Sequence, residues 1–150
     1  MGEMAQKISK VDHKELLDIL NVAFAEEWLA YYQYWIAARI MSGPMSLSIG
    51  EEFKKHAHEE KEHSELLATR IIELGGTPLI DPNDWSKVAK CKYDAPTDEY
   101  VLTIVKQVLA AERCAVTRYQ QICDMCFGKD YQTFKISAHI LEQELDHEQD

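Results

Sequence analysis

The sequence contains two Glu-x-x-His pairs, Glu60/His63 and Glu144/His147. At this spacing a carboxylate and an imidazole lie on neighbouring turns of one helical face, so both can bind the same metal ion. The chain has 16 Glu and 6 His in 150 residues, from which chance alone gives about 0.6 such pairs. Two pairs, one in each half of the chain, therefore favour a metal site.

A lone glutamate precedes each pair at nearly the same distance. Glu27 comes 33 residues before Glu60, and Glu112 comes 32 residues before Glu144. All four lie where the apolar stripe of a helix would otherwise continue, and a carboxylate on a core face is costly unless it is paired, protonated or metal-bound. Divalent cations relieve the repulsion among four such groups most simply. The alternative is that these acids are surface residues of a metal-free helical interaction protein.

Four helices must position these residues. Helix breakers cluster at residues 42–44, between 75 and 96, and at Gly128, and the segments between them carry apolar residues at helical spacing. We expect one all-α domain over residues 1–150, a four-helix bundle with a long crossover at about 75–96 between its second and third helices. The expected helices are about 11–41, 47–74, 97–127 and 130–150.

Charge and composition exclude several classes of partner. Lys and Arg number 16 against 26 Asp and Glu, a formal net charge of −10, which argues against binding to nucleic acid or to an anionic membrane. No run approaches the ~20 apolar residues of a membrane span, and the charged start lacks the apolar core of a secretory signal. Four cysteines are too few for a disulfide scaffold, so we expect a cytoplasmic protein.

The carboxylates and histidines, in their order along the chain, resemble the di-iron site of ferritin-like proteins, and that of bacterioferritin most closely. The resemblance covers about residues 11–150 and implies two Fe ions per subunit, for which Mn or Zn could substitute. The mixed oxygen and nitrogen donors suit Fe(II) or Mn(II) and lack the thiolates of a structural zinc site. By position, the resemblance implies Glu60 and Glu144 as ligands of both irons, Glu27 and His63 of one, and Glu112 and His147 of the other.

Other positions indicate which features of the ferritin-like family this chain is expected to share and which it is expected to lack. Tyr34, seven residues after Glu27, matches a tyrosine that the family keeps beside its metals. Lys61 stands where bacterioferritin has its haem methionine, so we expect no haem. The sequence ends at Asp150, three residues after His147, so we expect no fifth helix. Cages without that helix are typically the twelve-subunit Dps type.

The cysteines indicate a narrower branch of the family. The string from Ala111 to Val116, AERCAV, together with a cysteine in the crossover, is similar to the Dps-like thioferritins. Cys114 lies about 200° around its helix from Glu112, on the side along which the crossover can pass. The resemblance implies a redox pair of Cys91 and Cys114 near the metals; two unconnected thiols remain the alternative. Cys123 and Cys126 continue the apolar stripe and are interpreted as core residues.

The outer side of the first helix is also apolar. Trp28, Tyr32, Trp35 and Ile36 lie away from Glu27, which favours burial against another subunit and hence a homo-oligomer. His56, one turn before the first Glu-x-x-His pair, is either an outer iron-entry residue together with Glu59 or a capped or solvated histidine.

These observations predict an iron-oxidising, iron-storing mini-ferritin. The resemblance implies a ferroxidase that oxidises Fe(II) with hydrogen peroxide or oxygen, stores Fe(III) inside a cage of twelve subunits, and so protects against oxidative stress. A rubrerythrin-like di-iron peroxidase is the alternative enzyme.

Overall fold

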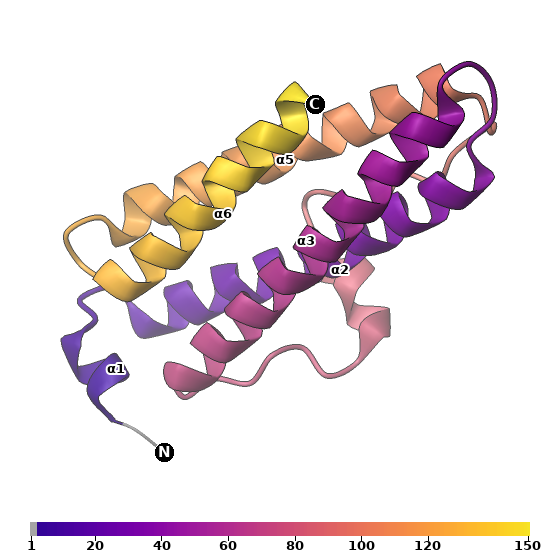
Figure 1. Ribbon diagram of the computed structural model, residues 1–150. Helices are drawn as coiled ribbons and strands as arrows, with labels where there is room; N and C mark the ends of the chain where they lie inside the picture. Colours follow the sequence, from indigo (N-terminus) through magenta and orange to yellow (C-terminus); the bar gives the residue numbers. More distant parts are fainter. Residues whose placement is uncertain (1–2) are drawn as a thin grey trace.

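A computed structural model describes residues 3–150 of the chain. These residues form mainly two long helical hairpins (Figure 1). In the first hairpin α2 packs along α3, and in the second α5 packs along α6. The crossover, residues 74–100, runs back along the length of the bundle from the end of α3 to the start of α5. The helices α3 and α5 therefore run in the same direction (Figure 1). The predicted four-helix bundle with a long crossover is confirmed. Its helices are α2 (His13–Ile40), α3 (Ser46–Glu73), α5 (Val101–Cys126) and α6 (Tyr131–Gln149).

The structure also contains short helices that the sequence analysis did not anticipate. They are α1 (Met4–Ile8), the 3-10 helix η1 (Pro82–Asp84) and α4 (Trp85–Val88), each too short to show a helical period. The third long helix begins at Val101 instead of residue 97, because Asp98 accepts hydrogen bonds from the backbone N–H of Tyr100 and the hydroxyl of Thr103. Within residues 3–150 no helix has both the length and the hydropathy needed to cross a membrane.

Two aspartates cap long helices, and one of them also closes the end of the bundle. Asp12 accepts from the backbone N–H of Glu15 at the start of α2, and Asp130 accepts from that of Thr133 at the start of α6. The buried guanidinium of Arg70, on α3, donates to both oxygens of Asp130 at 3.0 and 2.9 Å, and to the hydroxyl of Thr133. This ion pair therefore fixes the first hairpin to the second.

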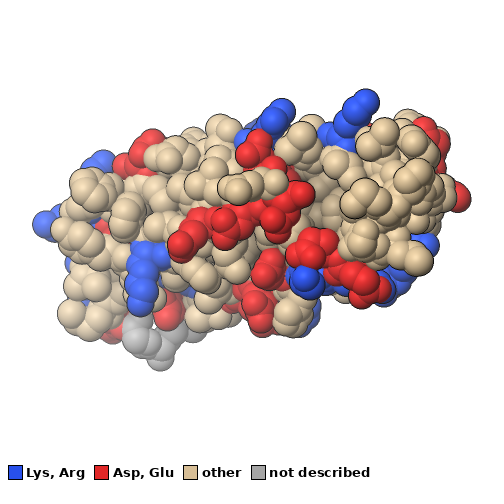
Figure 2. All heavy atoms as spheres, turned by 45° about the horizontal axis from the view of Figure 1, so that its top comes forward, with Lys and Arg blue, Asp and Glu red and all other residues tan. Residues whose placement is uncertain are grey.

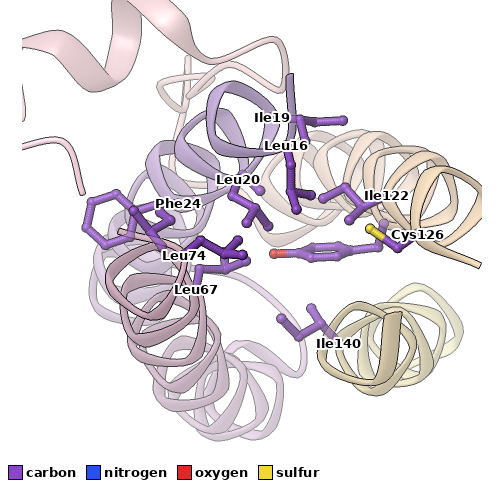
Figure 3. Close-up of a cluster of buried hydrophobic side chains, with 12 residues drawn as sticks. Leu16, Ile19, Leu20, Phe24, Leu67, Leu74, Ile122, Cys126 and Ile140 are labelled. Atoms are coloured by element: carbon purple, nitrogen blue, oxygen red, sulfur yellow. The ribbon is translucent and has the colours of Figure 1, made fainter. Parts of the chain in front are cut away.

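The apolar core has two parts, separated by a polar layer. Figure 3 shows one part, in which Leu16, Leu20, Leu67, Ile122 and Ile140 point toward one another from the four long helices. The other part lies nearer the α2–α3 turn and includes Tyr34, Phe53, Ala57, Ile104 and Val108. On α2, α3 and α5 the predicted metal-ligand positions fall between these two parts, so apolar side chains exclude water on either side of them.

The aromatic outer face of α2 is partly covered by the chain's own crossover. Trp85 stacks on Trp28 with ring centroids 5.4 Å apart, and Tyr93 lies 5.7 Å from Tyr32. The crossover therefore supplies part of the cover on this face, and burial of the remainder against another subunit stays a prediction. Tyr32 remains 48% exposed.

Candidate metal centre

The four long helices bring the six predicted side chains into one buried cluster. One Glu comes from each of α2 and α5, and one Glu-x-x-His pair comes from each of α3 and α6. Their ligand atoms form two groups of four within which all atoms lie within 4.8 Å of one another, and the two groups share Glu60 and Glu144. The first group adds Glu27 and His63, and the second adds Glu112 and His147.

The first group surrounds His63, whose side chain is 1% exposed. Its Nδ1 atom lies 3.1 Å from Glu27 Oε2, 3.2 Å from Glu60 Oε2 and 3.2 Å from Glu144 Oε1. One imidazole nitrogen thus faces three carboxylates from three different helices.

The second group surrounds His147 in the same way. Its Nδ1 atom lies 3.3 Å from Glu60 Oε1, 3.6 Å from Glu112 Oε2 and 3.8 Å from Glu144 Oε2. Both histidines therefore turn Nδ1 toward the cluster and Nε2 outward.

Burial and mutual repulsion perturb the carboxylates. Burial, reinforced by the neighbouring Glu60 carboxylate, raises the pKa of Glu27 to about 8. The same two causes raise the pKa of Glu144 well above its usual value. Burial also opposes ionisation of Glu60, but the adjacent His147 and His63 outweigh it and hold the pKa of Glu60 below its usual range. The shared Glu60 therefore stays ionised.

The pKa values of both histidines are raised as well. Burial disfavours their protonation, but the adjacent carboxylates of Glu144, Glu27 and Glu60 hold the pKa of His63 well above its usual value. The adjacent carboxylates of Glu112 and Glu60 likewise outweigh burial and raise the pKa of His147 to about 11. Protons therefore balance part of the carboxylate charge in this structure.

Several buried ligand atoms still lack a hydrogen bond of acceptable geometry within residues 3–150. They are Glu60 Oε1, Glu112 Oε2, Glu144 Oε1 and His147 Nδ1. A buried polar atom without a partner costs about 1–3 kcal/mol, so four in one cluster need a further partner. All four are acceptor atoms when deprotonated, which fits divalent cations bound by oxygen and nitrogen.

Two tyrosines donate hydrogen bonds to the two carboxylates that the ligand groups do not share. Tyr34, on α2, donates to Glu112 Oε1 of α5 at 2.8 Å, and Tyr119, on α5, donates to Glu27 Oε1 of α2. Both are buried, and burial with the adjacent carboxylates raises the pKa of each phenol well above its usual value. Tyr34 was predicted from the sequence and Tyr119 was not, although Tyr119 also follows the glutamate of its helix, Glu112, by seven residues.

The chain matches the family described as the ferritin-like domain over residues 17–150. It belongs to the ferritin-like family. A curated relative, the DNA protection during starvation protein of Pyrococcus furiosus, is 37% identical over 140 residues, which are 92% of this chain and 75% of the relative. The four-helix arrangement of the chain is therefore that of a ferritin-like domain.

Solved structures of ferritin-like proteins agree with this assignment. The structure of a dodecameric thioferritin, the bacterioferritin-related protein from Bacteroides fragilis, is 47% identical with a TM-score of 0.97, covering 99% of this chain and 89% of that one. Dps from Thermosynechococcus elongatus is 20% identical with a TM-score of 0.85, covering 90% of this chain and 86% of that one. The second likeness concerns the fold alone.

In this ferritin-like chain a disulfide lies beside the cluster. Cys91, in the crossover, is bonded to Cys114 of α5, with the two Cα atoms 5.6 Å apart. A cavity of about 20 Å³, enough for one water molecule, is lined by Cys91 together with the buried carboxylates Glu27 and Glu144. One cysteine of the disulfide, Cys91, and several of the candidate ligands thus border one small space.

A buried carboxylate that the sequence analysis missed fixes the position of Cys91. Glu26 Oε1 accepts hydrogen bonds from the backbone N–H groups of Lys90 at 2.7 Å and Cys91 at 2.9 Å. Arg118 of α5 donates to both oxygens of Glu26. The arrangement ties the crossover to α2 and α5 at the height of the disulfide.

Three further residues are buried near the bundle axis. Cys123 and Cys126 are free thiols in the core, as predicted. His56 is buried and stacks on His147 with ring centroids 4.1 Å apart, so its interpretation as a solvated histidine is wrong. Glu60 and His63 follow His56 at helical spacing and are also buried, so this side of α3 faces inward.

The remaining acids of the ferritin-like chain are distributed unevenly over the surface. Figure 2 shows a band of Asp and Glu side chains across the middle of one face, with Lys and Arg mainly toward its margins. A concentration of one sign of charge raises the local concentration of counter-ions, so this face attracts cations.

Proposed function

We propose that the protein is a ferroxidase and iron-storage protein whose substrate is Fe(II). The observation that carries the proposal is the pair of four-ligand groups sharing Glu60 and Glu144 in the buried centre of a ferritin-like chain. Two divalent cations held by shared carboxylates lie close enough to give up their electrons to one oxidant molecule.

The proposed reaction converts two Fe(II), one hydrogen peroxide and two protons into two Fe(III) and two water molecules. Each iron loses one electron, and the two electrons break the O–O bond. The protein supplies the carboxylates that favour the more highly charged product, the tyrosine hydrogen bonds that orient them, and apolar surroundings that exclude water. Oxygen is the second candidate oxidant.

We further propose that Fe(III) is stored inside a homo-oligomeric cage of twelve subunits. The 47% identical thioferritin from Bacteroides fragilis is dodecameric, and the acidic band in Figure 2 provides a surface that attracts Fe(II). Consumption of iron and peroxide together would protect a cell against oxidative stress.

The Cys91–Cys114 pair is proposed to be redox-active. A disulfide in a protein from a reducing compartment is usually catalytic or redox-sensing, and this one borders the same cavity as Glu27 and Glu144. Thiol titration before and after peroxide treatment of the reduced protein tests this role: loss of two thiols supports it, and unchanged thiols contradict it.

Iron oxidation by wild type and by a Glu60→Ala variant tests the main proposal. Anaerobic protein receives Fe(II) and then hydrogen peroxide, and ferric absorbance is followed. Wild type should oxidise iron much faster than buffer and elute as a large oligomer, whereas the variant should lose bound metal and rate. A wild-type dimer with peroxidase turnover would favour the rubrerythrin-like alternative, and equal metal content in both proteins would favour a metal-free interaction protein.

A further inference from the structure

The histidines of the two candidate metal positions have different hydrogen-bond partners at Nε2, the nitrogen that faces away from the cluster. His147 Nε2 donates to Glu59 Oε2 at 2.7 Å, and His63 Nε2 donates to Gln143 Oε1 at 3.1 Å. The outer partner of His147 is therefore a carboxylate, and the outer partner of His63 is a neutral amide.

These two partners occupy equivalent places in the two hairpins. Glu59 directly precedes the Glu-x-x-His pair of α3, and Gln143 directly precedes that of α6. Each supports the histidine of the opposite helix, and both line the same surface cavity of about 200 Å³. Glu59 and Gln143 thus occupy equivalent helix positions, but Glu59 carries a carboxylate and Gln143 a neutral amide.

The carboxylates of the two positions have matching contacts. Each group consists of three carboxylates and one histidine, of which two carboxylates are shared. Each unshared carboxylate accepts a hydrogen bond from a buried tyrosine, Tyr119 to Glu27 and Tyr34 to Glu112. Of the side chains that form hydrogen bonds with the candidate ligands, Glu59 and Gln143 are therefore the pair that differs in charge between the two positions.

We propose that Glu59 makes the two metal positions unequal, so that the position of Glu112 and His147 binds a divalent cation more tightly than that of Glu27 and His63. A carboxylate that accepts the outer N–H of an imidazole makes the other nitrogen a stronger donor and fixes the ring in its binding orientation. A charge-assisted hydrogen bond of this kind is about twice as strong as a neutral one. Glu59 also adds a negative charge on that side. The inference rests on the proposed function, because it concerns the same two sites.

Replacement of such an outer partner typically changes metal affinity by about 10–100-fold. Wild type should therefore bind Co(II) in two steps whose dissociation constants differ by about that factor. Glu59→Gln should weaken the tighter step by about 10–100-fold and bring the two steps together. Gln143→Glu should strengthen the weaker step by a comparable factor.

Anaerobic titration with Co(II), followed by its visible absorbance and by calorimetry, measures both steps without any turnover. The double variant Glu59→Gln/Gln143→Glu is the matched control, because it conserves net charge and composition. It should restore two separate steps, whereas Glu59→Gln alone should not. Both side chains line a solvent-open cavity, so these near-isosteric changes leave the core intact, and circular dichroism verifies the fold.

Two equal steps in wild type, or a Glu59→Gln variant in which both steps weaken alike, would overturn the inference. If Glu59→Gln fails to fold, Gln143→Glu still decides the matter, since an unchanged weaker step contradicts the proposal. Fewer than two Co(II) bound per wild-type chain would instead contradict the proposed function.

Discussion

Metal binding to this cluster should release at least three protons per chain at pH 7. The ligand atoms of metal-bound carboxylate and imidazole carry no proton. In the metal-free structure the pKa of Glu27 is raised to about 8 and that of His147 to about 11, while those of Glu144 and His63 lie well above their usual values. Glu27, His147 and His63 are therefore mainly protonated at pH 7, and two cations must displace at least these three protons.

The sign and size of the pH dependence follow from this count. A fall of one pH unit makes each proton about 1.36 kcal/mol harder to remove. With three protons, the overall free energy of binding two cations weakens by about 4 kcal/mol between pH 7 and pH 6. Above about pH 8 Glu27 is already ionised, so proton release should fall by about one.

A pH-stat titration with Co(II) under argon counts these protons directly. Glu27→Gln provides the matched control, because its amide has no proton to lose in this range and the count should fall by one at pH 7. Two bound Co(II) with fewer than two protons released, or an affinity that does not change between pH 6 and pH 7, would refute the reasoning.

Three other substitutions test structural contacts. Arg70→Met should lower the free energy of unfolding in urea by about 3–5 kcal/mol, because it leaves the buried Asp130 carboxylate unpaired; a loss below about 1 kcal/mol would contradict this. Loss of the disulfide in Cys91→Ser/Cys114→Ser should cost about 3 kcal/mol for a closed loop of this length, and equal stability of variant and oxidised wild type would count against it. Tyr119→Phe should retain the fold but bind Co(II) about 10–100-fold more weakly, so wild-type affinity would show that its hydrogen bond does not matter.

The fold was readable from the sequence because long amphipathic helices and their breakers leave a periodic signal. The metal-ligand candidates were visible for the same reason: Glu27 and Glu112 interrupt apolar stripes, and their spacing to the two Glu-x-x-His pairs repeats. Tyr119 carried the same seven-residue signal as Tyr34 and could have been found.

Other features depend on contacts between distant parts of the chain. Glu26 is buried because backbone N–H groups of the crossover and Arg118, 92 residues away, surround it, and no local pattern records this. Arg70 and Asp130 are 60 residues apart, and each looks like an ordinary surface charge in the sequence. The start of α5 was misplaced because Asp98 forms a turn with Tyr100 before the helix begins.

The most direct test of the account is the stoichiometry of iron oxidation by hydrogen peroxide. Anaerobic wild-type protein is loaded with Fe(II), titrated with peroxide, and compared with Glu60→Ala. The account predicts that two Fe(II) per chain are oxidised for each peroxide consumed, and that this fast phase disappears in Glu60→Ala. Identical rates and stoichiometry in the two proteins would contradict a di-iron centre at the shared carboxylates.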